Sequence, residues 1–232
     1  MPGPLVARWL TWSLDPPRAG ALGAAWAEIE NTGAATWRDD IAASYHWLDG
    51  RGNAIVWDGV RSPLPGVVPP GGRAKLEIAV RAPMPPGRYG FMLDLVAEHR
   101  AWFGELGGEP PRAEVDVSPR IEAGSLVEIA NSHVPAGAER ATDWEPRVLA
   151  LHADGFAVVA GALDAPRAKR KALAPWVPGP GRVPGFTSPL LCPSVLREID
   201  LERLPDVEGL PAFRPPPDEP WVYDASLVLR LR

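Results

Sequence analysis

The sequence predicts an all-β protein, with an immunoglobulin-type β-sandwich first and a smaller β-rich region carrying an extended proline-rich arm after it. Three observations predict this class. The 232 residues include 29 prolines and 23 glycines, which favour many short elements joined by turns because proline is excluded from helix interiors and central strands. Short apolar runs with period-two alternation recur from the N-terminus. Clusters of Gly, Pro, Asn and Asp separate these runs.

Seven runs in the first half of the chain have strand character, and their spacing fits a sandwich. They span residues 5–14, 24–30, 41–48, 54–59, 74–80, 88–98 and 112–118. The alternation is clear in the fifth run, where Leu76, Ile78 and Val80 share one face. Lys75 and Glu77 lie on the other, so we expect one buried and one hydrated face. The sandwich is predicted to end at residue 118.

The second region, residues 119–232, is less regular. Residues 147–163 are predicted to form a hairpin turning at Asp154-Gly155, because an Asp-Gly pair joins two apolar runs. Residues 221–232 are predicted to form a terminal strand. Between them, segment 165–220 is dominated by Pro and Gly, with a short helix expected at 194–204. A loop of this length is uncommon in a compact domain, so we expect an arm that contacts protein partners or other copies of the chain.

Composition excludes several classes of function. The net charge is −5 and the chain shows no dense basic face, which argues against nucleic acid as a partner. A single cysteine excludes a disulfide framework and a Cys-rich zinc site. No run of about 20 apolar residues occurs, so membrane insertion is not expected. The N-terminus lacks the pattern of a signal peptide, which predicts synthesis in the cytoplasm, followed by retention there or release by lysis within a particle.

Several motifs occur in order between about residues 20 and 108. They are Asn31-Thr32-Gly33 with Trp37, Tyr45-His46-Trp47-Leu48-Asp49, Arg61-Ser62-Pro63-Leu64-Pro65, Pro69-Pro70-Gly71, Pro86-Gly87-Arg88-Tyr89, Asp94-Leu95-Val96 and Trp102-Phe103. In this order they resemble a bacterial family, the immunoglobulin-like β-sandwich that accompanies glycosyltransferases and methyltransferases of surface-polysaccharide synthesis. The resemblance implies a non-catalytic module near polysaccharide chemistry, and carries no set of ligand residues. The usual catalytic domain is missing, and residues from about 119 onward lie outside the resemblance.

The stretch from Ser44 to Gly59 contains the main candidate site. Period-two alternation turns Tyr45 and Trp47 toward the core and His46 outward, while Trp57 on the returning strand can lie near either set. A surface that binds sugar needs aromatic faces beside polar groups, and the candidates for carbohydrate or partner binding are His46, Trp57, Asp58, Arg61 and Trp102. The alternative, that these residues form only core and turn, is favoured because aromatic side chains readily fill cores.

The sequence gives little support for catalysis. Asp94 and Glu98 share a strand face, but strand residues four apart lie about 13 Å from each other, beyond the separations that glycoside hydrolysis uses. An ion pair with Arg61 or Arg88 is the favoured role for these acids. The four histidines show no metal-binding spacing, and no serine lies in a nucleophile motif. We therefore expect no catalytic residue, no metal and no cofactor.

The sequence thus predicts a non-enzymatic structural and binding protein. It is expected to assemble into a larger complex and to contact cell-surface polysaccharide, for example as a spike or fibre-base subunit of a phage-like particle. The alternative is a cytoplasmic accessory protein of a glycosyltransferase or exporter in capsule or lipopolysaccharide synthesis. The N-terminal region also has more tryptophans than one small core can bury, which predicts that some lie at an interface or ligand surface.

Overall fold

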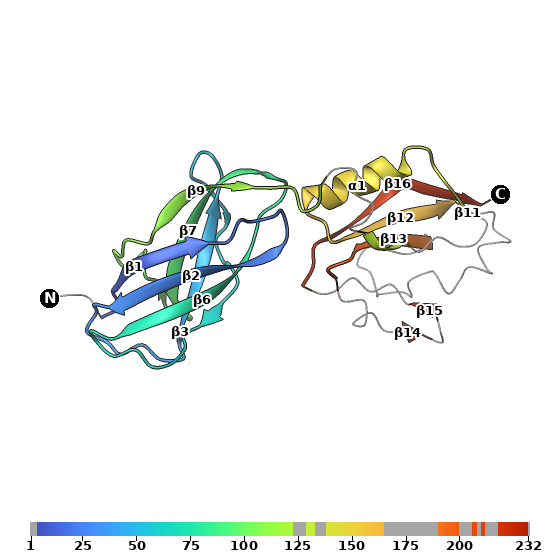
Figure 1. Cartoon of the computed structure of the whole chain (residues 1–232). Helices are drawn as coiled ribbons and strands as arrows, with labels where there is room; N and C mark the ends of the chain where they lie inside the picture. The colour runs from blue at the N-terminus through green and yellow to red at the C-terminus, as the bar shows by residue number, and fades with distance from the viewer. Residues whose placement is uncertain are drawn as a thin grey trace. The chain divides into compact units, whose positions relative to one another are not determined.

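The computed structural model describes residues 4–122, 129–132, 138–164, 190–199, 206–207, 210–211 and 218–231. The chain divides into two compact units, Met1–Ser118 and Pro119–Arg232, and each unit has its own hydrophobic core. Strands dominate both units, and the described residues include one short helix (Figure 1). The predicted all-β fold class is confirmed.

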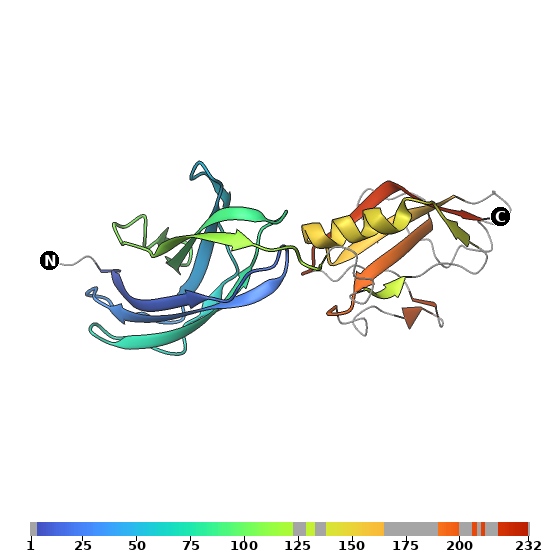
Figure 2. The same cartoon turned by 45° about the horizontal axis from the view of Figure 1, so that its top comes forward.

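The first unit is a sandwich of two antiparallel sheets, which face each other in Figures 1 and 2. One sheet has the order β1-β2-β6, with β1 at Ala7–Leu14, β2 at Leu22–Asn31 and β6 at Arg73–Arg81. The other has the order β4-β3-β7-β8, with β5 also paired to β3 and β9 to β7. Its strands are β3 (Ile41–Leu48), β4 (Ala54–Val56), β5 (Ser62–Pro63), β7 (Gly87–Ala97), β8 (Ala101–Trp102) and β9 (Arg112–Val117).

The core of the sandwich is formed by side chains that alternate inward from both sheets. Leu76, Ile78 and Val80 of β6 are buried, as the period-two pattern predicts. Tyr45 and Trp47 of β3 are buried in the same core, and their rings contact Phe91 of β7 at centroid distances of 6.0 and 4.7 Å. Edge-on and tilted aromatic contacts of this kind add to the free energy gained by burial alone.

The expectation of one hydrated face is wrong for β3 and β7. Both faces of these two strands are buried over most of their length. The predicted strand 54–59 ends at Val56, and the segment after it folds back over the outer face of β3. Trp102 covers the neighbouring part of that face beside Ala42 and Val96. This covering layer is a tertiary feature, which strand alternation does not encode.

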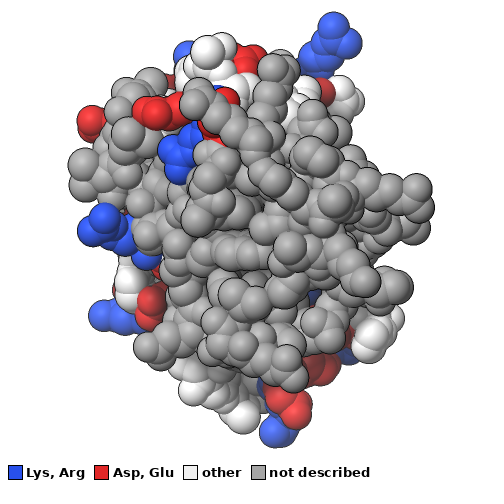
Figure 3. Space-filling model, turned by 90° about the vertical axis from the view of Figure 1, so that its right-hand side faces the viewer, with Lys and Arg blue, Asp and Glu red and all other residues white. Residues whose placement is uncertain are grey.

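The second unit contains a sheet of order β10-β13-β12-β16-β11. Its strands are β10 (Ile129–Ser132), β11 (Ala138–Arg140), β12 (Val158–Asp164), β13 (Leu190–Leu196) and β16 (Trp221–Leu231), while β14 (Asp206–Val207) and β15 (Leu210–Pro211) form a separate pair. β16 occupies the position predicted for the terminal strand, and it runs parallel to β12. Figure 3 shows described basic and acidic side chains around the edge of the face that it draws.

The predicted hairpin at Asp154-Gly155 is wrong. Residues Trp144–Asp154 form the helix α1, which ends at Gly155 with φ of 125°. Only the part of the predicted hairpin after Gly155 is a strand, β12. Trp144, Val148 and His152 are buried at four-residue spacing, which puts them on one face of a helix, so the Asp-Gly pair marks a helix end rather than a strand turn.

The predicted helix at 194–204 is also wrong in its first part, because Ser194–Leu196 belong to strand β13. Residues 200–205 lie outside the described part of the chain. Strand β13 also shows that part of the predicted arm, segment 165–220, is built into the sheet between β10 and β12. Most of the rest of that segment lies outside the described residues.

Candidate functional site

The five candidate residues gather on the outer face of the sheet at β3 and β7. The ring of His46 stacks on that of Trp57 at a centroid distance of 4.1 Å and meets the edge of Trp102 at 4.4 Å. The guanidinium of Arg61 lies 4.7 Å above the ring of Trp102, and Asp58 is paired with Arg61. We call this cluster, formed by His46, Trp57, Asp58, Arg61 and Trp102, the Trp57 site.

His46 lies at the bottom of the site, beneath Trp57. It is fully buried, and its Nδ1 is hydrogen-bonded to the backbone carbonyl of Trp57. This bond and the stacked rings fix the Trp57 side chain against β3. His46 covers one face of the indole, and Trp57 as a whole residue is 41% exposed.

Gly59 allows the covering segment to lie directly on β3. Its N–H donates to the carbonyl of Tyr45 at 3.2 Å. A Cβ at this position would lie 2.6 Å from that carbonyl oxygen and 2.8 Å from two carbons of the Tyr45 ring. Only glycine therefore fits here without a shift of the segment that carries Trp57 and Asp58.

Arg61 ties the covering segment to the end of β7. Its guanidinium donates to Glu98 at 2.8 Å and to Asp58 at 2.9 Å. It also donates to the hydroxyl of Ser44 at 3.3 Å and to the carbonyl of Gly59 at 3.0 Å. Burial acts against the charge on Arg61, but the hydrogen bonds and charges of the two carboxylates outweigh it and raise its pKa. Arg61 is therefore a charged and positioned donor at the rim of the site.

Asp94 lies beneath the site and is almost fully buried. Its carboxylate accepts backbone N–H groups from Leu95 at 2.7 Å and from Gly104 at 3.1 Å. Its Oδ2 lies 3.6 Å from Nε2 of His46. Both members of this His-Asp pair are buried, and the His46 ring contacts the rings of Trp57 and Trp102.

The structure corrects part of the predicted site. His46 and Trp102 were expected to offer surface groups, but they are 0% and 7% exposed and lie beneath the other members. The groups open to a ligand are the indole of Trp57, the carboxylate of Asp58 and the guanidinium of Arg61. The predicted ion pair between Arg61 and Glu98 is present, whereas Arg88 pairs with Glu114.

Trp26 was not among the five candidates. It lies on β2 of the opposite sheet and is 46% exposed, in a position as open as that of Trp57. The signal was in the sequence, because Ala25, Ala27 and Ile29 form the buried face of β2 and Trp26 therefore falls on the outward one. Trp26 and Trp57 are exposed, and it stays a prediction that some of the tryptophans lie at an interface or ligand surface.

Across the described ranges, no three His, Cys, Asp or Glu side chains are arranged to hold a metal ion. Likewise, the one helix in the described residues is too short to cross a bilayer.

These observations define the first unit as a β-sandwich with an aromatic site on the outer face of one sheet. No family model matches the chain, and neither does any curated protein compared with it. Among solved structures, it is similar to the C-terminal domain of Wzt, with a TM-score of 0.38 and 9% identity over 57% of this chain and 84% of that one. It is also similar to the Pseudomonas fluorescens alkylpurine DNA glycosylase AlkC bound to DNA containing an abasic-site analogue. There the TM-score is 0.28, with 14% identity over 50% of this chain and 30% of that one. Neither similarity is strong enough to bear on function.

Proposed function

We propose that the first unit is a non-enzymatic module that binds a saccharide chain at the Trp57 site. The observation that carries the proposal is the exposed indole of Trp57, which stacks on buried His46 and stands beside the Asp58 and Arg61 pair. A surface tryptophan that is fixed against a buried side chain offers a flat apolar face and has little conformational entropy to lose on binding.

The chemistry of the site suits a sugar ring. The C–H face of a pyranose is apolar and packs against an aromatic face, while its hydroxyl groups need donors and acceptors at the ring edge. Asp58 supplies a carboxylate on a side chain that is 70% exposed, and Arg61 supplies a charged guanidinium on a side chain that is one-third exposed. The pairing of these two groups fixes their positions before a ligand arrives.

A non-catalytic role is supported by the state of the nearby acids. Asp94 is buried and accepts backbone hydrogen bonds, and Glu98 is held by Arg61. Both are therefore engaged in holding the site together. A purified sample that cleaved a bound polysaccharide would overturn this part of the proposal.

Two settings are proposed for such a module. In the first, the protein is a subunit of a larger particle or complex, such as a spike or fibre base of a phage-like particle, and the site contacts cell-surface polysaccharide. In the second, it is an accessory protein of a capsule or lipopolysaccharide glycosyltransferase or exporter. Light scattering after size-exclusion chromatography separates them, since a strict monomer would contradict the particle.

The binding proposal is tested by a glycan array with the intact protein and two variants. Trp57→Ala is expected to weaken binding at least about tenfold, as for loss of an aromatic anchor. The matched control is Ile55→Ala on the same hairpin, because Ile55 is 46% exposed but is not part of the site. Circular dichroism and urea unfolding check that each variant is folded. The proposal is wrong if no glycan binds, or if both variants bind equally well.

A further inference from the structure

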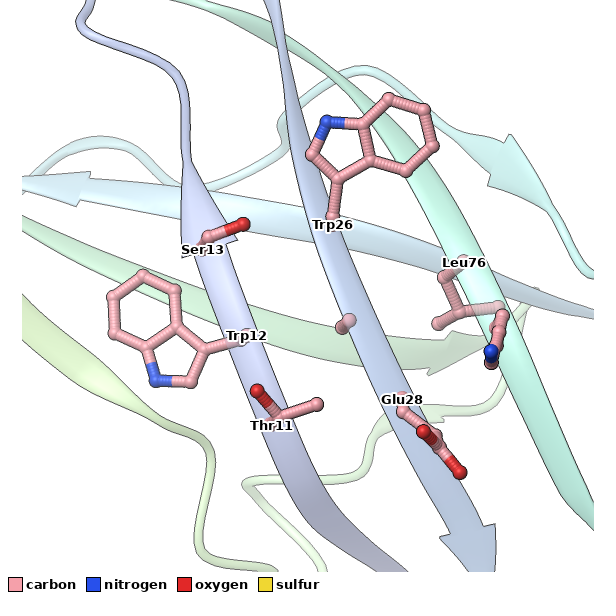
Figure 4. A pocket seen from close by; sticks show the side chains of 8 residues that line it. Thr11, Trp12, Ser13, Trp26, Glu28 and Leu76 are labelled. Carbon is pink, nitrogen blue, oxygen red and sulfur yellow. The ribbon is translucent and has the colours of Figure 1, made fainter.

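A second open tryptophan lies on the other sheet of the sandwich. Trp26 is on β2, the central strand of the β1-β2-β6 sheet, yet 46% of it is exposed. Tryptophan is highly buried on average, so its exposure on a central strand is unusual and indicates a candidate binding surface. Trp26 borders a shallow pocket of about 240 Å³ on the sheet surface (Figure 4).

The pocket is set by strand register. Thr11 of β1 lies opposite Glu28 of β2, which in turn lies opposite Lys75 of β6. One step along the outer face, Ser13 lies opposite Trp26. Figure 4 shows Trp26 and Glu28 on β2 beside Thr11 and Ser13 on β1. Trp26 therefore stands beside two hydroxyl groups, a carboxylate and an ammonium group, and Trp12 also lines the pocket.

These polar groups are not engaged with one another. Across the described part of the chain, no hydrogen bond or ion pair involves the side chains of Thr11, Ser13, Glu28 or Lys75. In the neighbouring row of residues on the same outer face, the polar side chains are paired with one another. Glu30 accepts a hydrogen bond from Arg8 at 2.7 Å and lies 3.3 Å from Arg73. The row beside Trp26 thus keeps its donors and acceptors available, while the adjacent row satisfies its own.

We propose that this pocket is a second saccharide subsite, which holds one uncharged pyranose ring against Trp26. Its volume is below the range of about 300–1,000 Å³ found for drug-sized ligands, so it suits a single ring. The charges of Glu28 and Lys75 offset each other, and Glu77 opposite Trp26 adds a negative charge, which disfavours an acidic sugar. The inference shares its ligand class with the proposed function but concerns different residues.

The two sites lie on opposite outer faces of the sandwich, one on each sheet. Stacked sheets are about 10 Å apart, and the sites stand outside that thickness. One short oligosaccharide therefore cannot occupy both of them. The module is expected to hold two separate segments of polysaccharide, and the second site raises its avidity for a multivalent glycan surface.

Fluorine NMR of the intact protein labelled with fluorotryptophan tests the inference. The resonances of Trp26 and Trp57 are assigned with Trp26→Phe and Trp57→Phe. The probes are glucose, galactose, mannose and N-acetylglucosamine, each raised to about 50 mM, with glucuronate as the charged comparison. We expect at least one neutral sugar to shift the Trp26 resonance to saturation, with a dissociation constant of about 1 mM or above. Glucuronate is expected to shift it less.

Two variants localise the effect. Glu28→Gln is expected to weaken the sugar-dependent shift several-fold, whereas Glu77→Gln, which does not line the pocket, should change it less than twofold. The inference is wrong if none of the neutral sugars moves the Trp26 resonance, or if that resonance moves only with protein concentration, which would mean that a second copy covers the pocket. A shift at Trp57 alone would leave the proposed function standing and remove this inference; a shift at Trp26 alone would do the reverse.

Discussion

The phenolic oxygen of Tyr45 on β3 accepts a hydrogen bond from the backbone N–H of Arg81 on β6 at 2.9 Å. The indole N–H of Trp47 donates to the backbone carbonyl of the same Arg81 at 3.0 Å. Strand β6 is the last strand of its sheet, so backbone groups on its outer edge have no strand partner. Two aromatic side chains of one sheet therefore close the edge of the other, which protects it from pairing with another chain.

Tyr45→Phe is expected to lower the free energy of unfolding of the first unit by about 1 to 2 kcal/mol. The ring still fills the core, but the N–H of Arg81 loses its acceptor in a largely dry position. Urea unfolding at neutral pH measures the change. Tyr89→Phe is the matched control, because its hydroxyl donates to the carbonyl of Pro85 at an exposed position and should matter by less than about 0.5 kcal/mol. Equal effects of the two variants would contradict the role given to Tyr45.

Asn31 is the second polar group that fixes the sandwich. It is fully buried, and its amide donates to the carbonyls of Ala35 at 2.8 Å and Val68 at 2.9 Å. Its side-chain oxygen accepts the N–H of Gly33 at 3.0 Å. The Asn31-Thr32-Gly33 sequence therefore forms a turn that also joins a distant loop.

Asn31→Asp is expected to destabilise the first unit by about 3 kcal/mol at pH 7, because an ionised carboxylate cannot donate to two carbonyls and its charge is buried. The same substitution at Asn53, whose amide makes an exposed hydrogen bond to Asp49, is expected to have an effect below about 1 kcal/mol. Thermal and urea unfolding of both variants give the comparison. A stable Asn31→Asp protein would show that the buried amide is not needed.

The sequence was a good guide to the first unit wherever burial follows strand parity. Tyr45 and Trp47 point inward and His46 outward, as period-two alternation requires. The prediction from sequence was wrong where a local motif is compatible with two structures. Asp154-Gly155 is a hairpin signal, but here it follows a helix, and Gly155 with its positive φ ends α1. Trp144, Val148 and His152 are buried on one face, which favours a helix before Gly155 over a strand.

The candidate site was predictable in its members but not in its arrangement. Trp57, Asp58 and Arg61 were predicted from their residue types. Their positions, however, depend on a segment that leaves the strand at Val56 and folds over His46. That fold depends on the close approach of Gly59 to Tyr45, which no short-range pattern encodes.

Gly59→Ala tests this dependence. The new methyl group would overlap the carbonyl and ring of Tyr45, so the covering segment must shift, and we expect a loss of about 1 to 3 kcal/mol in stability. The Trp57 resonance should move in the absence of ligand, while that of Trp26 on the other sheet stays in place.

The control is Gly50→Ala in the neighbouring turn, where an added Cβ meets no atom within 4 Å. Its stability should remain within about 0.5 kcal/mol of the parent protein. If Gly59→Ala also left stability and the Trp57 resonance unchanged, the covering segment would not depend on this contact.

His152 gives the second unit a defined dependence on pH. It is fully buried in the last turn of α1, and its Nδ1–H donates to the carbonyl of Phe156 at 2.7 Å. The pKa of His152 is lowered from 6.5 to about 4, mainly by burial. The hydrogen bond to Phe156 raises the pKa in part, and the positive charge of Arg120 lowers it further. The folded state therefore resists a proton that the unfolded state accepts below about pH 6.5.

The contribution of His152 to stability is consequently complete above about pH 6.5 and is lost as the pH falls toward 4, by at most about 3 kcal/mol. The fluorotryptophan resonance of Trp144, on the same helix, follows unfolding of the second unit in urea at about pH 7.5 and about pH 5. His152→Asn keeps a donor near Phe156 but does not titrate, so its unfolding midpoint should be lower at neutral pH and vary less between the two conditions. An equally steep pH dependence in this variant would assign the effect to other groups, because the buried imidazole is then not the group that takes up the proton on unfolding.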